Sequence, residues 1–510
     1  MTKPFNINQK IVTERLSSKV ENSSENSIIC VDLDGTLVRT DTLVEAVFSV
    51  LRARPLSVFS VFLWLFKGRL EFKARVFKSP DLDLDPETLP YNYEIIDWLK
   101  TKKREGSKLV LATASRIEVA GPVAEHVGIF DEVITSTDKV NLKGKAKADL
   151  LSERYGKGKF SYIGDAPVDL VVWQAASVAH IAAHSSRIVK SAKAVSKVGK
   201  IFRVEGNSLK SIIKAIRPHQ WAKNLLVFVP VIMAHQFSQS WLQAFLAFVA
   251  FSSTASSIYI INDIVDVPSD RQHPQKKRRP FASGDLDPRF AAVLFPALLM
   301  FGLAIGAAVN FKFFGVLIAY TFITTLYSFI LKRIAIADVL VLSGLYTLRI
   351  MAGGIATATD VSNWLMSFSL FLFLSLAFMK RVSEVRMTMV AHQRAPRSRD
   401  VRIKDVTISG RDYLVDDLII LSGMGTGSGF ISVLVFALYI ATLGVRATYA
   451  RPDVLWLACP VLLYWICRAW LLTHRGKMDS DPVAFAIKDK ASLVTLLVLA
   501  IIWAAAWLSP

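Results

Sequence analysis

The amino-acid sequence predicts a two-part fold: an amino-terminal α/β unit with a helical cap, then an all-α polytopic membrane unit of about nine transmembrane helices. Three observations support this prediction. Short β-branched runs alternate with helical stretches from about residue 27 to 200. Long apolar stretches dominate from about residue 221 onward. Hydrophobic residues make up 52% of the 510 residues, and the mean hydropathy of +0.39 exceeds that of ordinary soluble proteins.

The net charge of +19 could serve either of two kinds of partner. One is nucleic acid, and the other is anionic lipid together with phosphorylated substrates. In so apolar a chain, basic residues in short loops favour the membrane, and we expect no nucleic-acid partner. The three cysteines, Cys30, Cys459 and Cys467, have no metal-site spacing and predict no disulfide framework. The polar tail, residues 1–26, lacks a signal-peptide apolar segment, so we expect the α/β unit in the cytoplasm.

The α/β unit is expected to span residues 27–185. Its strands Ser27–Val31, Lys108–Ala112 and Phe160–Ile163 each end at a polar or glycine-containing turn. This pattern is typical of a parallel sheet, whose ligands bind at the carboxyl ends of the strands.

A helical insertion at about residues 40–105 is expected to form the cap. Its apolar run Leu56–Phe66 is too short to span a bilayer. The run is either a buried cap helix or an interfacial membrane contact, because four cations flank it: Arg52, Arg54, Lys67 and Arg69. The basic, small-residue stretch 186–210 is expected to link this unit to the membrane unit of residues 211–510.

The segment IICVDLDGTL carries two aspartates directly after the first strand. Residues i and i+2 of a strand point the same way, so Asp32 and Asp34 can address one site. We expect Asp32 to attack phosphorus, and Asp34 to protonate the leaving oxygen and then activate water. Three later motifs supply a phosphate-binding hydroxyl, a lysine and two further carboxylates: Thr113, Lys147 (preferred over Lys143 and Lys145), Asp165 and Asp169.

These four motifs, in this order, resemble the haloacid-dehalogenase superfamily. The resemblance implies a Rossmann-like phosphatase domain with Mg²⁺ held by Asp32, the Asp34 carbonyl and Asp165. Asp169 would support the ion directly or through another ligand. A domain that binds phosphate without turnover is the alternative, although no substitution argues for it. The cap would select the substrate, and its sequence does not identify that substrate.

The membrane unit is expected to contain nine spans. Basic residues concentrate in alternate loops, around residues 271–289, 332–333, 380–411 and 475–490, so these loops are expected to face the cytoplasm. Because the number of spans is odd, Pro510 is expected on the side of the membrane opposite the cytoplasm. The spans are expected near 221–236, 241–262, 290–309, 312–331, 337–357, 363–380, 417–443, 453–473 and 491–508.

Acidic residues cluster where the second of these spans ends. Asn262, Asp263, Asp266 and Asp270 fall at i, i+1, i+4 and i+8, which places the aspartates near one helical face, and carboxylates at a membrane boundary are costly unless they bind a cation. We expect Mg²⁺ that bridges to a diphosphate. Two nearby cations could neutralise phosphate oxygens, Lys276 and Arg279.

This NDxxDxxxD pattern, with nine spans, resembles the UbiA superfamily. Four segments are similar to its decaprenyl-phosphate phosphoribosyltransferase branch: RPHQWAKN at 217–224, HPxKxxRP at 273–280, YSFILK at 327–332 and LRIMAGG at 348–354. The resemblance implies phosphoribosyl pyrophosphate as donor and a polyprenyl phosphate as acceptor.

Two departures from the family pattern matter. Enzymes that ionise prenyl diphosphates typically carry a second DxxxD, whereas Asp338 here is followed by Val339, Leu340, Val341 and Leu342. This departure disfavours aromatic prenylation. Pro268 lies inside the first motif, so we expect the helix to kink or end there, which leaves Asp270 the least certain ligand.

Several other polar residues of this unit are candidates for substrate contact. Lys223, Lys332, Lys380 and Arg381 either meet the lipid phosphate or anchor the loops at the cytoplasmic side. Arg349 lies in an apolar stretch, where a charge needs a partner, and we expect it to bind phosphate. Tyr327 is either a packing aromatic or a substrate contact, and Asn224 is expected to bind substrate.

We therefore expect a phosphoribosyltransferase of the inner membrane that carries a Mg²⁺-dependent phosphatase. The phosphatase is expected to remove the 5-phosphate of the lipid product. Two alternatives remain open: prenyl transfer from a diphosphate to an aromatic acceptor, and a non-catalytic lipid-binding scaffold with a phosphatase attached. The sequence does not give the isoprenoid length or the oligomeric state.

Overall fold

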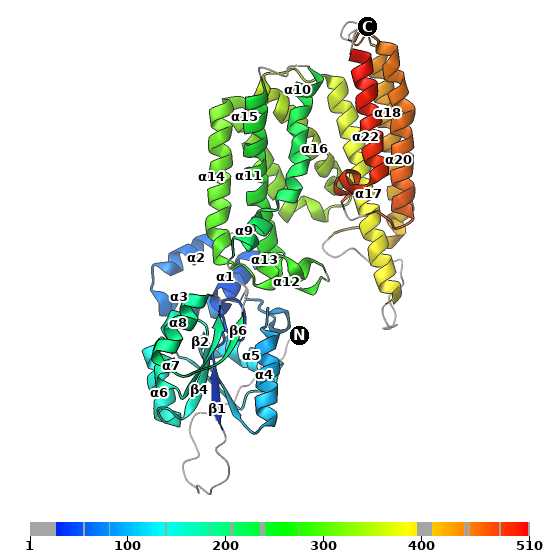
Figure 1. The fold of residues 1–510 in the computed structure, drawn as a ribbon. Coiled ribbons are helices and arrows are strands. Elements are labelled where there is room, and N and C mark those ends of the chain that lie inside the picture. Colours follow the sequence, from blue (N-terminus) through cyan, green and yellow to red (C-terminus); the bar gives the residue numbers. More distant parts are fainter. Residues whose placement is uncertain are drawn as a thin grey trace. The chain divides into compact units, whose positions relative to one another are not determined.

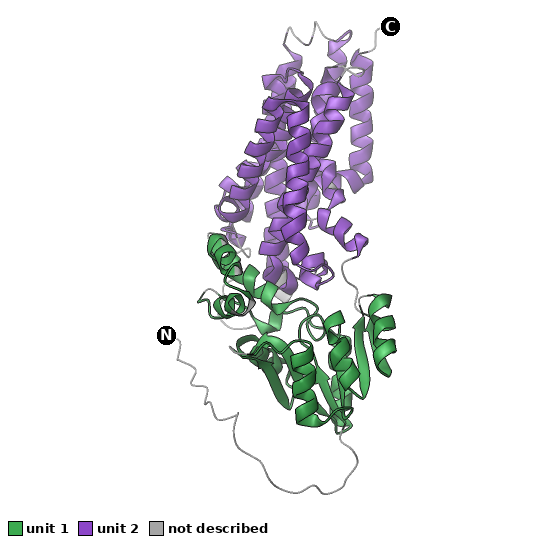
Figure 2. Ribbon diagram, turned by 90° about the vertical axis from the view of Figure 1, so that its left-hand side faces the viewer, with its two compact units in different colours: residues 1–205 green, residues 206–510 purple. Residues whose placement is uncertain are grey.

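The computed structural model describes residues 27–54, 57–80, 82–137, 140–183, 185–203, 208–234, 240–273, 275–394, 411–442, 445, 449–478 and 481–507. The chain divides into two compact units, unit 1 (Met1–Glu205) and unit 2 (Gly206–Pro510), which Figure 2 shows in separate colours. The predicted polar tail, residues 1–26, and Pro510 lie outside the described residues.

Unit 1 contains a six-stranded parallel sheet in the order β3-β2-β1-β4-β5-β6 (Figure 1). The central strand β1 pairs with β2 on one side and β4 on the other, so the carboxyl ends of these three strands meet at one edge. The strands are β1 (Ile28–Val31), β2 (Lys108–Arg116), β3 (Glu132–Ser136), β4 (Phe160–Gly164), β5 (Val178–Ala183) and β6 (Val198–Arg203).

Helices cover both faces of this sheet, as Figure 1 shows. Alternate strand residues point to opposite faces, and the buried residues accordingly fall into two clusters. Ile29 and Val31 pack with residues of α4 (Tyr93–Arg104) and α5 (Ile117–Val127). Cys30 packs with residues of three helices, α6 (Lys145–Tyr155), α7 (Leu170–Ala175) and α8 (Ser186–Val195). The predicted α/β fold with a parallel sheet is confirmed.

The helical insertion after β1 contains α1 (Thr42–Ala53), α2 (Ser57–Leu65), α3 (Arg69–Phe77) and η1 (Pro86–Thr88). The predicted cap of residues 40–105 was too long, because α4 packs against the sheet. The predicted linker of residues 186–210 was wrong for most of its length. Ile188 and Ala192 of α8 are buried against the sheet, and β6 adds an edge strand that buries Phe202.

Unit 2 is helical, and among its described residues eight helices are long and apolar enough to cross a membrane. They contain α11 (Trp241–Val265), α14 (Arg289–Val309), α15 (Phe311–Phe329), α16 (Ala337–Thr357), α17 (Asn363–Arg394), α18 (Leu418–Ile440), α20 (Ala458–His474) and α22 (Lys490–Trp507). Shorter elements connect them, namely α9 (Leu209–Ile216), α12 (Val267–Gln272), η4 (Lys276–Arg278), α13 (Pro280–Ser283), η5 (Leu331–Arg333), η7 (Val415–Asp417), η8 (Pro452–Leu457) and α21 (Pro482–Lys488).

The predicted first span, 221–236, is not one of these eight helices. Its residues form a 3₁₀ helix, η3 (Pro218–Phe228), and a short α10 (Val229–Met233). Pro230 lacks a backbone N–H and its ring is disfavoured inside a helix, and it lies in the first turn of α10, where the 3₁₀ segment has ended. The count of nine was therefore approximate, and the parity argument for Pro510 no longer holds.

The acidic motif lies where α11 ends. The helix stops at Val265, and α12 begins at Val267 with Pro268 in its first turn. The predicted break near Pro268 is confirmed. It turns Asp270 onto a second helix, away from the axis of α11.

Candidate functional site

Unit 1 gathers carboxylates at the carboxyl ends of β1 and β4. Asp32 follows β1, Asp165 follows β4, and Asp169 ends the 3₁₀ turn η2 (Pro167–Asp169). One oxygen from each lies within 4.8 Å of the others. We call these three residues the acidic triad. It joins residues that are more than 130 positions apart in sequence, as expected where parallel strands end side by side.

Lys147 neutralises this triad from α6. Its Nζ lies 3.0 Å from Asp32 Oδ2 and donates to the Tyr162 hydroxyl at 2.8 Å. Tyr162 in turn donates to Asp169 Oδ1 at 3.1 Å. Lys147 is buried whereas Lys143 and Lys145 are exposed, which supports the preference for Lys147. Tyr162 was missed in the sequence because it sits in the buried apolar pattern of β4.

Asp34 occupies a separate, half-buried position beside the triad. Its carboxylate accepts from the Thr42 backbone N–H and from the Ser115 hydroxyl, each at 2.7 Å. Burial, followed by the charge of Asp41, raises the pKa of Asp34 to about 6. Thr113, the predicted phosphate ligand, is fully buried, and its Oγ1 accepts the backbone N–H of Ser115 at 2.9 Å. Ser115 was not predicted, although it is two residues after Thr113 on the same strand.

The triad has the donor set of a hard divalent cation. Burial raises the pKa of Asp165 and that of Asp169, the latter to about 6, and the neighbouring carboxylates raise both further. Gly35 (φ +74°) lets the backbone pass beside the triad, because a Cβ there would lie 2.2 Å from Asp165 Oδ2. Crowded carboxylates that repel one another favour an ion such as Mg²⁺, so the residues fit the implied metal.

In unit 2, Asp263 is enclosed by two arginines. Its side chain is 2% exposed, and its Oδ1 pairs with Arg217 and, at 3.1 Å, with Arg279 Nη1. Arg279 also reaches Asp270 Oδ2 at 2.5 Å. Asp263 Oδ2 is buried and has no hydrogen-bond partner among the described residues. We call Asp263, Asp266, Asp270, Arg217 and Arg279 the membrane-unit site.

The carboxylates of this site alternate with cations. Asp266 lies 3.5 Å from Lys332 Nζ, and in the described part of the chain only the acidic triad of unit 1 brings three acidic groups within 4.8 Å. The unpartnered Oδ2 of Asp263 suits a cation, and the arginines suit phosphate oxygens, so the residues fit a Mg²⁺–diphosphate group. Arg217 was missed, although it begins the RPHQWAKN segment; its backbone is left-handed (φ 57°).

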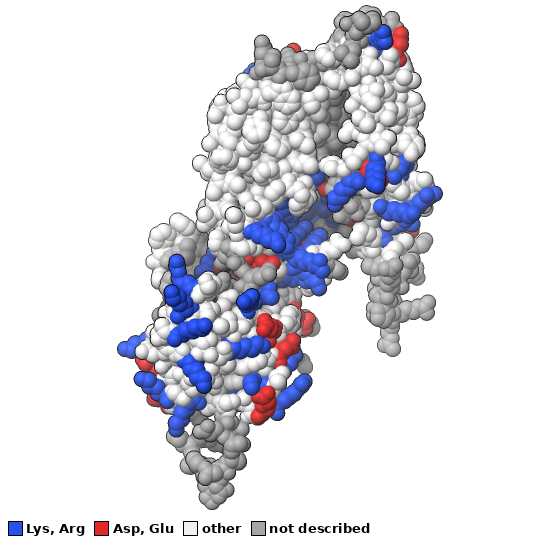
Figure 3. Space-filling model, in the orientation of Figure 1, with Lys and Arg blue, Asp and Glu red and all other residues white. Residues whose placement is uncertain are grey.

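Four other predicted polar residues of unit 2 differ in their surroundings. Lys276 is exposed on η4. Lys223 donates to Asp481 Oδ2 at 2.5 Å and lies 5.9 Å from the ring of Tyr346. Lys380 and Asn262 are half-buried. In Figure 3 the charged side chains of unit 2 lie mainly at one end of its helices, and most of them are Lys or Arg.

Arg349 and Asn224 lie in the interior of unit 2. Arg349 is 5% exposed, and its guanidinium donates to Asn224 Oδ1 at 2.9 Å, Leu345 O at 2.5 Å and Tyr320 OH at 3.2 Å. It also faces the rings of Phe251, Tyr320 and Tyr346 at 5.2–5.6 Å. The expected partner of this charge exists, but it is protein, and the geometry gives no support to the predicted phosphate contact of Arg349 or the predicted substrate contact of Asn224.

Tyr327 and Arg381 belong to a second buried network. Both contact Asp338, the Tyr327 hydroxyl at 2.7 Å and Arg381 Nη2 at 3.1 Å from Oδ1. Arg411 Nη1 lies 3.0 Å from the same oxygen, and Arg381 also pairs with Glu384. The other oxygen, Oδ2, forms an ion pair with Arg381 Nε, so both oxygens of Asp338 face protein cations. Among the described residues, the polar partners of Tyr327 and Arg381 are one another, Asp338 and Glu384, rather than residues of the membrane-unit site.

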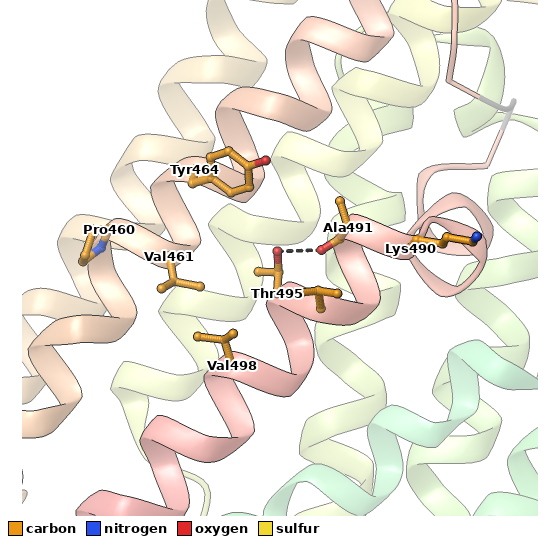
Figure 4. Close-up of a pocket in the computed structure, with 8 residues that line it drawn as sticks. Pro460, Val461, Tyr464, Lys490, Ala491, Thr495 and Val498 are labelled. Atoms are coloured by element: carbon orange, nitrogen blue, oxygen red, sulfur yellow. Dashed lines mark hydrogen bonds between the residues drawn. The ribbon is translucent and has the colours of Figure 1, made fainter.

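An apolar groove of about 630 Å³ lies between α20 and α22. Figure 4 shows Val461 and Tyr464 of α20 facing Thr495 and Val498 of α22 across it, with Lys490 at one end. It contains no residue of the membrane-unit site. Its lining suits a hydrocarbon chain and offers no group for phosphoryl or glycosyl transfer.

The sequence model of the UbiA prenyltransferase family matches residues 225–496. The chain is 34% identical over 471 residues to the uncharacterized protein y4nM of Sinorhizobium fredii, which covers 91% of this chain and 88% of that protein. It is 33% identical over 187 residues to the decaprenyl-phosphate phosphoribosyltransferase of Mycobacterium tuberculosis, a match that covers 36% of this chain and 62% of that enzyme. A substrate-bound phosphoserine phosphatase structure aligns with 38% of this chain and 99% of its own, at 16% identity and a TM-score of 0.26.

Proposed function

The chain belongs to the UbiA prenyltransferase family, and from that premise we propose that unit 2 transfers 5-phosphoribose from phosphoribosyl pyrophosphate to a polyprenyl phosphate of the decaprenyl type. The observation that carries the proposal is the membrane-unit site, where a buried carboxylate with an unpartnered oxygen lies between two arginines. Similarity to the mycobacterial phosphoribosyltransferase supports this choice of donor and acceptor.

The state of Asp338 supports a donor other than a prenyl diphosphate. Its carboxylate is fully buried: Oδ1 contacts Tyr327 and Arg411, and Oδ2 forms an ion pair with Arg381, so protein groups already occupy both oxygens that a second metal ion would need. The DxxxD pattern that would supply a second metal site is also absent from the sequence after Asp338. One acidic cluster, with its arginines, then has to bind the whole diphosphate.

In the proposed reaction, the bond between ribose C1 and the pyrophosphate oxygen breaks, and pyrophosphate leaves with the electron pair. An oxygen of the lipid phosphate forms the new bond to C1, so no redox partner is needed. Mg²⁺ held by Asp263 and Asp266, with Asp270 beside them, would neutralise charge on the departing group. Arg217 and Arg279 exchange their carboxylate partners for phosphate oxygens and hold the donor in line.

The lipid phosphate is assigned to cations close to this site. Lys332 approaches Asp266, and Lys223 is held by Asp481 until an anion replaces that carboxylate. Lys276 and Lys380 extend the basic surroundings. The basic loops are expected on the cytoplasmic side of the inner membrane, where the soluble donor is available.

Unit 1 is proposed to be a phosphatase that acts on the product of unit 2. Asp32 attacks phosphorus and forms an aspartyl phosphate, while Asp34 donates a proton to the leaving alcohol oxygen. Asp34 then takes a proton from the water that releases inorganic phosphate. Lys147 offsets the charge of the attacking carboxylate, and Mg²⁺ at the acidic triad would draw charge from the phosphoryl oxygens.

The two reactions are proposed to act in sequence on one lipid. Phosphoribosyl transfer leaves a 5-phosphate on the product, and unit 1 is attached to the same chain. Only a short stretch separates the end of β6 at Arg203 from the start of α9 at Leu209. A tether this short gives an effective concentration in the millimolar range, so a weakly binding phosphatase suffices.

Incubation of membranes with ribose-labelled phosphoribosyl pyrophosphate and polyprenyl phosphate tests the first step. Label is expected to enter lipid; consumption of a prenyl diphosphate with no label in lipid would establish the aromatic prenyltransferase instead. Turnover of neither donor would favour the scaffold. For the second step, Asp32→Asn protein should accumulate phosphoribosyl lipid, whereas unaltered protein releases inorganic phosphate and ribosyl lipid. Identical phosphorylated products from both proteins would end the coupling proposal.

A further inference from the structure

The cap helix α2 presents an apolar face to the outside of unit 1. Four apolar residues on successive turns are strongly exposed, with 59–75% of their surface accessible to solvent: Phe59, Phe62, Leu63 and Phe66. The rings of Phe62 and Phe66 contact each other edge to face, with centroids 5.1 Å apart. An exposed cluster of three phenylalanines and a leucine within eight residues is costly in water, so it requires an apolar partner.

The opposite side of α2 fixes the helix to unit 1. Val61 is buried, and Trp64 packs against the core that contains the β1 residues. The apolar face is therefore held outward by packing rather than by a loose segment. The interpretation as a buried cap helix is wrong, because among the described side chains of this segment Phe59, Phe62, Leu63 and Phe66 are exposed while Val61 and Trp64 are covered.

The surroundings of the face identify the partner as a lipid surface. Arg54 and Lys67 lie exposed at the two ends of α2, so an apolar centre is flanked by positive charge. Nine helical residues extend about 14 Å, roughly half of a bilayer's hydrocarbon core, so α2 can lie in the interface but cannot span it. The same chain carries eight candidate membrane spans among its described residues, so unit 1 is covalently tethered to a unit that is expected to enter a bilayer.

The α2 face is also connected to the phosphatase site. After Gly68, the chain turns into α3, whose Lys73 donates from Nζ to the carbonyl oxygen of Ala114 at 3.2 Å. Ala114 lies between Thr113 and Ser115, the residue that holds Asp34. The cap thus joins the outward apolar face to the strand that forms the site.

We propose that the α2 face inserts into the interface of an anionic membrane and presents the phosphatase site to phosphate groups carried on lipids. The substrate class of unit 1 is then an interfacial lipid phosphomonoester. The membrane docking stands on the exposed face alone, whereas the substrate class rests on the proposed phosphatase function.

Docking is tested with the full chain in vesicles of phosphatidylcholine and phosphatidylglycerol. A bimane label is placed at Phe62→Cys after Cys459→Ser and Cys467→Ser, and doxyl-labelled lipids serve as quenchers. The control label at Lys157→Cys is exposed on the loop between α6 and β4. Several-fold stronger quenching at residue 62 supports insertion. Equal, weak quenching at both positions overturns it. A label at residue 62 that is shielded from water but is not quenched by the doxyl-labelled lipids also overturns it, because that result would indicate a protein partner.

The substrate class is tested with Phe59→Ser/Phe62→Ser/Phe66→Ser. Its matched control removes two exposed valines from α7 and α8, Val171→Ser/Val195→Ser. Hydrolysis of vesicle-borne phosphoribosyl lipid, collected from Asp32→Asn protein, is expected to fall about tenfold or more in the triple variant. Hydrolysis of p-nitrophenyl phosphate should stay unchanged, which also shows that the variant folds. If the triple variant loses activity equally on both substrates, or loses activity on neither, the substrate class is contradicted. If the parent protein hydrolyses neither substrate, the phosphatase function is refuted instead, and the quenching result alone decides whether α2 docks on the membrane.

Discussion

Replacement of Arg349 by methionine tests whether this arginine stabilises unit 2 or binds phosphate. Methionine retains an unbranched apolar chain but removes the guanidinium, which donates to Asn224, Leu345 and Tyr320. Hydrogen bonds between membrane helices contribute about 0.6–1.7 kcal/mol each. The bond to Leu345 lies within α16, so two of the three join different segments and together amount to about 1–3 kcal/mol. We therefore expect Arg349→Met to lower the free energy of unfolding by about 1–3 kcal/mol.

The measurement is unfolding of the purified chain in mixed micelles with a rising fraction of sodium dodecyl sulfate. Lys312→Met, which removes an exposed cation at the start of α15, is the matched control and should change little. A double-mutant cycle with Asn224→Ala isolates the pair, and we expect a coupling energy of about 1 kcal/mol. The folded Arg349→Met protein should keep its KM for polyprenyl phosphate within about twofold.

The opposite pattern would refute this reasoning. Unchanged unfolding, together with a KM for polyprenyl phosphate raised tenfold or more, would make Arg349 a ligand of the lipid phosphate. The aromatic rings at 5.2–5.6 Å would then be the walls of a substrate site rather than the packing of a buried cation.

Three further predictions concern unit 1. Mg²⁺ should raise the melting temperature of unit 1 more at pH 7.5 than at pH 5, because the pKa of Asp169, raised to about 6, lets protons compete with the ion at low pH. Without the ion, the stability that comes from this raised pKa is lost as the pH rises from the unfolded-state pKa of 3.8 through 6. Equal Mg²⁺-induced shifts of the melting temperature at both pH values would contradict the metal site. Gly35→Ala should lower p-nitrophenyl phosphate hydrolysis about 100-fold, because its Cβ would lie 2.2 Å from Asp165 Oδ2. Gly158→Ala has the same φ of +74° but nothing within 4 Å of its Cβ, so it should not lower hydrolysis. Similar losses in both variants would show that backbone strain alone is responsible. Lys147→Met should lower kcat about 100-fold while the exposed Lys145→Met leaves it unchanged, and a Lys147→Met enzyme of normal kcat would remove this residue from the mechanism.

The catalytic and metal-binding aspartates at the strand ends of unit 1 could be predicted from the sequence, because the pattern of an apolar strand followed by an aspartate is local. Each aspartate of the acidic triad follows or closely succeeds a short apolar strand, and parallel pairing brings those ends together. The choice of Lys147 rested on its place in a motif, and its burial supports that choice. Tyr162 could not be recognised, because a hydroxyl inside a buried strand has the same periodicity as a packing aromatic.

Contacts between distant segments were beyond local patterns. Lys223 and Asp481 are 258 positions apart, and Arg349 and Asn224 are 125 apart. No periodicity or spacing encodes such pairs, so the sequence could state only that Arg349 needs a partner. The same limit affected β6, an edge strand whose only fully buried side chain, Phe202, gives too weak an alternation to distinguish it from a linker.

Asp263 is the residue on which the proposed transfer depends most directly. Asp263→Asn keeps the size of the side chain but removes the charge between Arg217 and Arg279. Asp360→Asn, which removes an exposed carboxylate between α16 and α17, is the matched control. The measurement is single-turnover transfer of ribose label from phosphoribosyl pyrophosphate to polyprenyl phosphate in Mg²⁺. We predict a loss of about 1,000-fold or more for Asp263→Asn and none for the control; near-normal transfer by Asp263→Asn would contradict the assignment of the active site.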